Sequence, residues 1–147
     1  MSENIEQDRK EAHYVVKSSQ ELVDTLKSAQ NGDRIFLEPG RYEAKSLFLC
    51  GKNVSLIGAS IKDVILEFKS DISQKLETFL ICSVAGTLPT LIKRMTFKSL
   101  SSELNQAKIK FLGVAGGTVQ LEDCLFDATD HSDADAVYSN AKIAGKQ

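Results

Sequence analysis

The chain has 147 residues, which is enough for one domain with a sizeable hydrophobic core. Its net charge of −2 argues against a general nucleic-acid binder, because such a protein needs a basic surface to neutralise phosphates. No apolar run approaches the ~20 residues of a membrane span, and the first residues lack the apolar core of a secretory signal. We therefore expect a cytoplasmic protein without membrane insertion and without nucleic acid as a partner.

The N-terminal residues precede the first regular pattern. Residues 1–12 lack apolar periodicity, and we expect them to be disordered. A Tyr-Val-Val run then predicts a short strand within residues 13–17. The folded part of the chain is therefore expected to begin at residue 13.

A helix is predicted over residues 18–30. Ser18 and Glu21 have the spacing of a capping box at its start. Its apolar residues recur on one face, and they are Leu22, Val23, Leu26 and Ala29. The Asn31-Gly32 pair is expected to end the helix, because both residue types tolerate the left-handed backbone found there.

From residue 34 onward the pattern changes to short apolar strands separated by turns. The strands are predicted at 34–37, 46–50, 54–57 and 64–68. Pro39-Gly40 forms a turn between two of them. The polar stretches 69–75 and 99–106 are expected to loop out. No second helical pattern separates the strands, so a sheet built from βαβ units is disfavoured.

Two segments in the second half of the chain repeat each other. They read FLICSVAGTLPTLIKRMTF and FLGVAGGTVQLEDCLF, and both pass from an apolar strand through Val-Ala-Gly into a strand that ends in Phe. Ala85 matches Ala115 and Phe97 matches Phe126, which gives a register of 30 and then 29 residues. A repeat of this length, built from short strands and glycine turns, indicates a stacked β-solenoid.

The predicted fold is therefore all-β, a solenoid of a few coils with an N-terminal capping α-helix. The helix would close the open end of the first coil with its apolar face. The domain is expected to cover residues 13–140. Residues 141–147 would be a truncated coil, so we expect the chain to be a fragment or short isoform of a longer protein.

A family resemblance rests on the run from Asn31 to Tyr42, with Gly-Asp, Pro-Gly and the tyrosine, followed by Val54-Ser-Leu-Ile-Gly58. This run resembles the start of a pectin-lyase-like right-handed parallel β-helix, over roughly residues 14–140. Within that superfamily the chain resembles the Shc-binding protein and Nessun Dorma family of spindle proteins, including its testis-expressed member. The features that carry this resemblance are Glu21-Leu22-Val23, Gly32-Asp33-Arg34-Ile35, Pro39-Gly40-x-Tyr42, and the paired Phe97 and Phe126.

The resemblance implies a setting and a type of function. Members of that family use the domain within a larger protein to bind proteins, with glycans as a further class of ligand. They act at the spindle or intercellular bridge during cytokinesis, including meiosis in spermatogenesis. This chain departs from the family in its shorter length. The resemblance implies cytoskeletal, spindle or chaperone partners.

One acidic stretch is a candidate for catalysis. It holds Asp127, Asp130, His131, Asp133 and Asp135. Such groups could bind a hard cation or protonate a glycosidic oxygen. However, they are consecutive in a predicted loop, whereas catalytic pairs in a solenoid come from equivalent positions of adjacent coils. Those positions in the preceding repeat are Lys98 and Ser99, which offer no carboxylate. We therefore assign no catalytic, metal-binding or cofactor-binding residue and expect no enzyme.

The remaining candidates have structural interpretations. Arg34, Arg41 and Arg94 are expected on the surface, with contact to a carbohydrate or acidic partner as the alternative. Asp33 is expected to form a turn. The cysteines are expected to be buried free thiols; they are Cys50, Cys82 and Cys124. The phenylalanines are expected to form a core ladder rather than a sugar-stacking platform; they are Phe36, Phe48, Phe79, Phe97, Phe111 and Phe126.

Two hypotheses for function follow. The leading one is a non-enzymatic binding or scaffold module of a cytoplasmic spindle- or cytokinesis-associated protein. The alternative is a carbohydrate-active protein, either a polyuronate lyase or hydrolase or a lectin-like glycan binder.

Overall fold

The computed structural model describes residues 5–43, 47–48, 53–69, 76–83, 90–100, 108–116, 118–127, 134–139 and 142–146. The described helices are α1 (Ile5–Glu11) and α2 (Ser19–Ser28). The first six strands are β1 (Tyr14–Val16), β2 (Arg34–Leu37), β3 (Gly40–Glu43), β4 (Leu47–Phe48), β5 (Ser55–Gly58) and β6 (Val64–Lys69). The others are β7 (Leu76–Ser83), β8 (Thr90–Leu100), β9 (Lys108–Gly116), β10 (Thr118–Asp127), β11 (Ala134–Ser139) and β12 (Lys142–Lys146).

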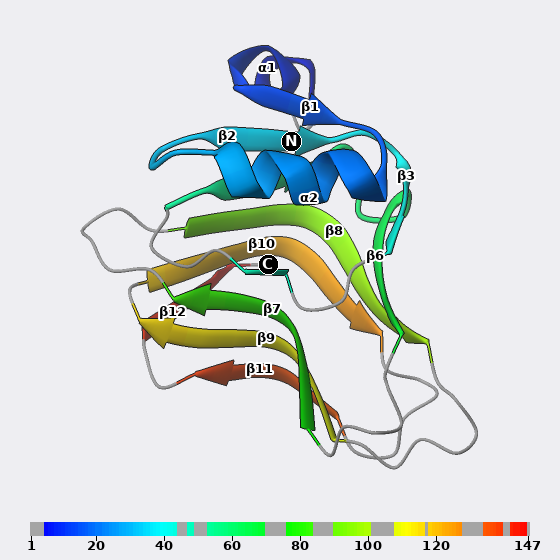
Figure 1. The fold of residues 1–147 in the computed structure, drawn as a ribbon, viewed down its shortest axis with the longest axis vertical. Helices are drawn as coiled ribbons and strands as arrows, with labels where there is room; N and C mark the ends of the chain where they lie inside the picture. Colours follow the sequence, from blue (N-terminus) through cyan, green and yellow to red (C-terminus); the bar gives the residue numbers. More distant parts are fainter. Residues whose placement is uncertain are drawn as a thin grey trace.

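These strands form two sheets, and the strand pairs in both are parallel (Figure 1). The larger sheet has eight strands, with the order β1-β2-β5-β8-β10-β12 and with β3 and β6 attached through β8. The smaller sheet has the order β11-β9-β7-β4. Strand β8 is long enough to pair with β5 through its first half and with β6 through its second half.

This arrangement corrects the predicted fold class. The described chain combines parallel sheets with two helices, which is an α/β-like arrangement rather than an all-β right-handed parallel β-helix, and the described residues show no closed solenoid. Short apolar strands at close spacing occur in parallel sheets of either class, so their pattern does not distinguish the two. The expected disorder of residues 1–12 is also wrong for Ile5–Glu11, which form helix α1.

The predicted match between the two repeats is confirmed where it can be followed. Phe97 and Phe126 are partners in the β8–β10 ladder, and their rings stack with centroids 5.1 Å apart. Ala85 lies outside the described residues. The aromatic pair therefore belongs to the interior, as the repeat predicted.

Helix α2 begins as the sequence predicts. Ser18 is its N-cap, and the hydroxyl accepts a hydrogen bond from the Glu21 backbone at 3.2 Å. The Glu21 carboxylate in turn accepts from the Lys17 backbone N–H at 2.8 Å, so two donors near the helix start are satisfied. The predicted end is wrong: the helix stops at Ala29, whose backbone is extended, and Gly32 makes a separate turn with φ of 88°.

The buried face of α2 covers one end of the larger sheet. Leu22 and Leu26 are buried, as predicted, and α2 contacts both β1 and β3. Each of these strands pairs with only one neighbour among the described strands. Covering such edges with a helix protects their unpaired backbone groups.

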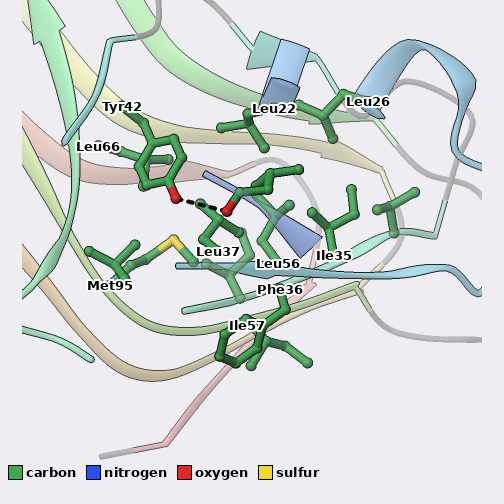
Figure 2. Close-up of a cluster of buried hydrophobic side chains, with 14 of the residues drawn as sticks. Leu22, Leu26, Ile35, Phe36, Leu37, Tyr42, Leu56, Ile57, Leu66 and Met95 are labelled. Atoms are coloured by element: carbon green, nitrogen blue, oxygen red, sulfur yellow. Dashed lines mark hydrogen bonds between the residues drawn. The ribbon is translucent and has the colours of Figure 1, made fainter. Parts of the chain in front are cut away.

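The core lies between α2 and the strands β2, β5, β6 and β8 (Figure 2). Tyr42, Leu66 and Phe97 are successive partners across β3, β6 and β8, and all three are buried. The Tyr42 hydroxyl donates toward the backbone carbonyls of Glu38 at 2.6 Å and Val16 at 3.1 Å. Tyr42 therefore ties the turn after β2 to the end of β1.

The predicted phenylalanine ladder is confirmed for Phe97 and Phe126, which stack in the core. It is wrong for Phe36, which is buried but points to the opposite side of β2 from Ile35 and Leu37 and so lies outside that ladder. The side chains of Phe48, Phe79 and Phe111 lie outside those that the structure describes.

Candidate binding surface

The outward side chains of strands β3, β6, β8 and β10 form two parallel rows. Residues i and i+2 of a strand lie on the same side, so the residues flanking the inward row of Tyr42, Leu66, Phe97 and Phe126 point away from the core. The charged row consists of Glu43, Glu67, Lys98 and Asp127. The mixed row consists of Arg41, Ile65, Thr96 and Leu125. Together these eight residues define the outer face.

An ion pair links the two rows. The Arg41 guanidinium lies 2.8 Å from a Glu67 carboxylate oxygen, while most of the arginine side chain remains exposed. Glu67 is only 7% exposed. Because an ionised carboxylate is costly to bury without a partner, Arg41 is the group that makes this position tolerable for Glu67.

Two exposed apolar side chains lie in or beside the mixed row. Leu125 is 51% exposed, and Ile61, in the turn before β6, is 37% exposed. Thr96 lies between these regions, and its hydroxyl donates to the Ile61 carbonyl at 2.6 Å. The outer face thus combines apolar side chains with charges beside them, which is a composition typical of protein interfaces.

The acidic stretch considered for catalysis is divided by the structure. Asp127 ends β10 and is the ladder partner of Lys98, so the predicted equivalence of these positions is confirmed. Asp135 lies in β11 of the smaller sheet, where Lys110 is its backbone partner in the β11–β9 ladder. Asp130, His131 and Asp133 lie outside the described residues. Within the described ranges, no three His, Cys, Asp or Glu residues gather into a group that could hold a metal ion.

Sequence reasoning missed one pair of stacked carboxylates. Glu43 and Glu67 are partners in the β3–β6 ladder. The two repeats that align equivalent positions lie in the second half of the chain, and β3 and β6 precede both. The available signal was local: each glutamate directly follows an inward apolar residue, Tyr42 or Leu66.

The arginine prediction holds at two positions and is wrong at the third. Arg34 and Arg41 are exposed. Arg94 is only 4% exposed, its Nε donates to the Gly58 carbonyl at 2.9 Å, and its guanidinium pairs with Asp8 of α1. An arginine within an apolar strand looks like a surface residue from the sequence, but here α1 brings a carboxylate to it.

Arg94 also marks a bend in the sheet. Its φ is 55°, and Asp123, opposite it in β10, has φ of 51°. Both values are unusual for residues other than glycine. Strands β8 and β10 both curve along their length (Figure 1).

Asp33 and His13 support the entry to β2. The Asp33 carboxylate accepts from the Gln30 backbone N–H at 2.9 Å, which confirms its predicted role as a turn former. The His13 Nδ1 accepts from the Arg34 backbone N–H at 3.0 Å. Both side chains therefore have structural roles in this turn.

Cys124 is a free, partly buried thiol, in agreement with its predicted structural role. Burial raises its pKa to about 11, which keeps the thiol protonated at neutral pH and disfavours its use as a nucleophile. Cys50 and the side chain of Cys82 lie outside the described part of the chain.

No family model matches the chain, and neither the curated proteins nor the solved structures include a significant match to it. Among the described helices, neither is long and apolar enough to span a membrane.

Proposed function

We propose that the chain is a non-enzymatic binding module and that the outer face is its binding surface. The observation that supports this most directly is the register of strands β3, β6, β8 and β10, which aligns the charged row beside the mixed row. Rows on a parallel sheet hold side chains at a regular strand-to-strand spacing of about 4.8 Å. Because Glu67 and Thr96 are each only 7% exposed, a ligand that crosses these strands would contact mainly the exposed residues toward the ends of the rows, which are Arg41, Glu43 and Leu125.

The chemistry of the two rows favours a protein segment as that ligand. The exposed Leu125 and Ile61 provide apolar contact area, and the Arg41–Glu67 pair and Lys98 provide polar contacts around it. The partner is expected to present an apolar side chain toward Leu125 and a cation toward Glu43. Its association should weaken at high salt, because exposed charges are screened.

The cellular setting comes from the sequence resemblance. The proposed partners are cytoskeletal, spindle or chaperone proteins in the cytoplasm of dividing cells, including meiotic germ cells. This part of the proposal rests on the motif around Asp33 and Pro39-Gly40.

The test compares matched surface variants. Leu125→Glu should lower the recovery of specific partners from dividing germ cells at least tenfold, because it places a charge in the apolar part of the outer face. Val15→Glu is the control, since Val15 is 41% exposed and belongs to β1 instead. Each recovered partner is then purified and titrated against both variants. Equal binding by the two variants would show that the outer face is not the binding surface.

A carbohydrate-active function is the second candidate, and one observation favours it. Glu43 and Glu67 are stacked carboxylates on adjacent strands, the arrangement from which an acid and a base could act on a glycosidic bond. The ion pair with Arg41 fits the binding proposal better, because it holds Glu67 as a structural anion. Unsaturated or hydrolysed product from a polyuronate panel with calcium, abolished by Glu43→Gln, would establish this candidate instead.

A further inference from the structure

A second surface lies beneath helix α1, on the outward side of β2, β5 and β8. Phe36, Ile57 and Lys93 are successive ladder partners there. Phe36 and Ile57 are almost fully buried, and α1 contacts β2. These three residues, together with Glu38 and Arg94, define the α1 site.

Helix α1 is held in this site mainly by two adjacent side chains of opposite charge. Asp8 pairs with Arg94 and lies 3.9 Å from the Lys93 ammonium. Arg9 makes two contacts with the Glu38 carboxylate, at 2.8 and 2.9 Å. The two pairs have opposite polarity, so the site specifies both the position and the direction of the helix.

Helix α1 also contacts an aromatic ring and the hydrophobic core. The Arg9 guanidinium lies over the Phe36 ring, 5.0 Å from its centroid. Ile5, one turn before Asp8, packs against the core while remaining partly exposed. The site therefore recognises an apolar residue, an acidic residue three positions after it, and an arginine four positions after it.

The helix itself is a weak structural element. It has seven residues, none of which is buried. An isolated helix of this length is not stable in water, so the site induces the helical conformation. Because α1 is part of the same chain as the site, its local concentration there is high. It can therefore occupy the site without a strong intrinsic affinity.

We propose that the α1 site is a recognition site for a short helix of a partner protein, which α1 occupies in cis as an internal competitor. The partner helix carries the same pattern of an apolar residue, an acid and an arginine. Binding in trans displaces α1 and frees the segment before β1. This surface is separate from the outer face, so the inference goes beyond the proposed binding function and does not depend on it.

The experiment supplies α1 in trans to the full chain. A fluorescent peptide of residues 2–12 is titrated by anisotropy against the wild-type chain and against the double variant Asp8→Ala, Arg9→Ala. The double variant weakens the internal competitor, so the peptide should bind it at least tenfold more tightly than it binds the wild type. Peptide helicity should rise on binding.

A charge exchange tests the specificity of the site. The Arg9→Glu peptide should not bind the double variant, because its glutamate would face Glu38. Binding should return when the chain also carries Glu38→Arg. Failure of the wild-type peptide to bind a folded double variant would overturn the proposal, as would equal binding of the wild-type and Arg9→Glu peptides.

A measurement on the wild-type chain covers the case in which the double variant does not fold. Excess wild-type peptide should accelerate hydrogen exchange of the chain's own residues 5–11 while leaving α2 unchanged. Unaltered exchange in α1 would contradict displacement. A wild-type dimer that exchanges α1 between copies would also overturn the proposal, because the occupant would then be a second copy of the chain.

Discussion

At the scale of single residues, buried polar groups hold the irregular parts of the chain in place. The Tyr42 hydroxyl contacts carbonyls from two different segments, and the Arg94 guanidinium contacts both α1 and β5. Burial raises the Tyr42 pKa to about 12, and the charges of Glu38 and Glu21 contribute in the same direction. These groups are buried because they bridge segments, not because they are apolar.

Tyr42→Phe tests this bridging role. The variant removes the hydroxyl that donates to the Glu38 carbonyl, while the Val16 carbonyl keeps its hydrogen bond from the Glu38 backbone N–H at 3.0 Å. Loss of the buried hydroxyl should lower the free energy of unfolding by about 1–3 kcal/mol at pH 7. Urea denaturation followed by circular dichroism measures the change. A loss below about 0.5 kcal/mol would mean that water replaces the hydroxyl at no cost.

The same variant tests how the free energy of unfolding depends on pH. The folded pKa of Tyr42 is about 12 and its ordinary value is 10.0, so between these values the unfolded chain loses the proton while the folded chain keeps it. The stability contributed by Tyr42 is therefore complete below pH 10 and is lost as the pH rises toward 12. The wild type should lose more stability than Tyr42→Phe over this range. If the stabilities of the two proteins fall in parallel with pH, the raised pKa of Tyr42 is contradicted.

At the scale of elements, helix α2 combines a sequence-encoded start with a tertiary role. Its cap was predictable because Ser18 and Glu21 act over a few residues. Its end was not, because Ala29 turns into an extended conformation and packs into the core, which is a tertiary effect. The same contrast applies to α1, whose polar sequence gave no sign of the Asp8 and Arg9 partners far along the chain.

Ser18→Ala should destabilise the protein by about 1 kcal/mol, because the Glu21 backbone N–H at the helix start loses its acceptor. Ser28→Ala is the matched control in the last turn of the same helix, where the hydroxyl only donates to the Asp24 and Thr25 carbonyls. The control should change stability by less than about 0.5 kcal/mol. Thermal denaturation compares them, and equal losses would argue against a specific cap.

At the scale of the whole molecule, parallel pairing of distant segments determines what the sequence could reveal. The stacking of Phe97 on Phe126 was predictable, because the two repeats share a pattern. The fold class was not, because the number of strands in a sheet and the packing of helices on it leave no local pattern. The outer face was also missed, since Glu43, Glu67 and Lys98 become neighbours only through strand register.

The bend at Arg94 has a consequence for which substitutions the chain can accept. A Cβ atom at Gly58 would lie 2.1 Å from the Arg94 backbone oxygen. Because the obstruction is main chain, no change of side chain at position 94 can make room for it. In a saturation library scored for folded protein, position 58 should accept glycine alone, and a second-site search at position 94 should recover no suppressor. The two positions are coupled in space but cannot compensate for each other in evolution.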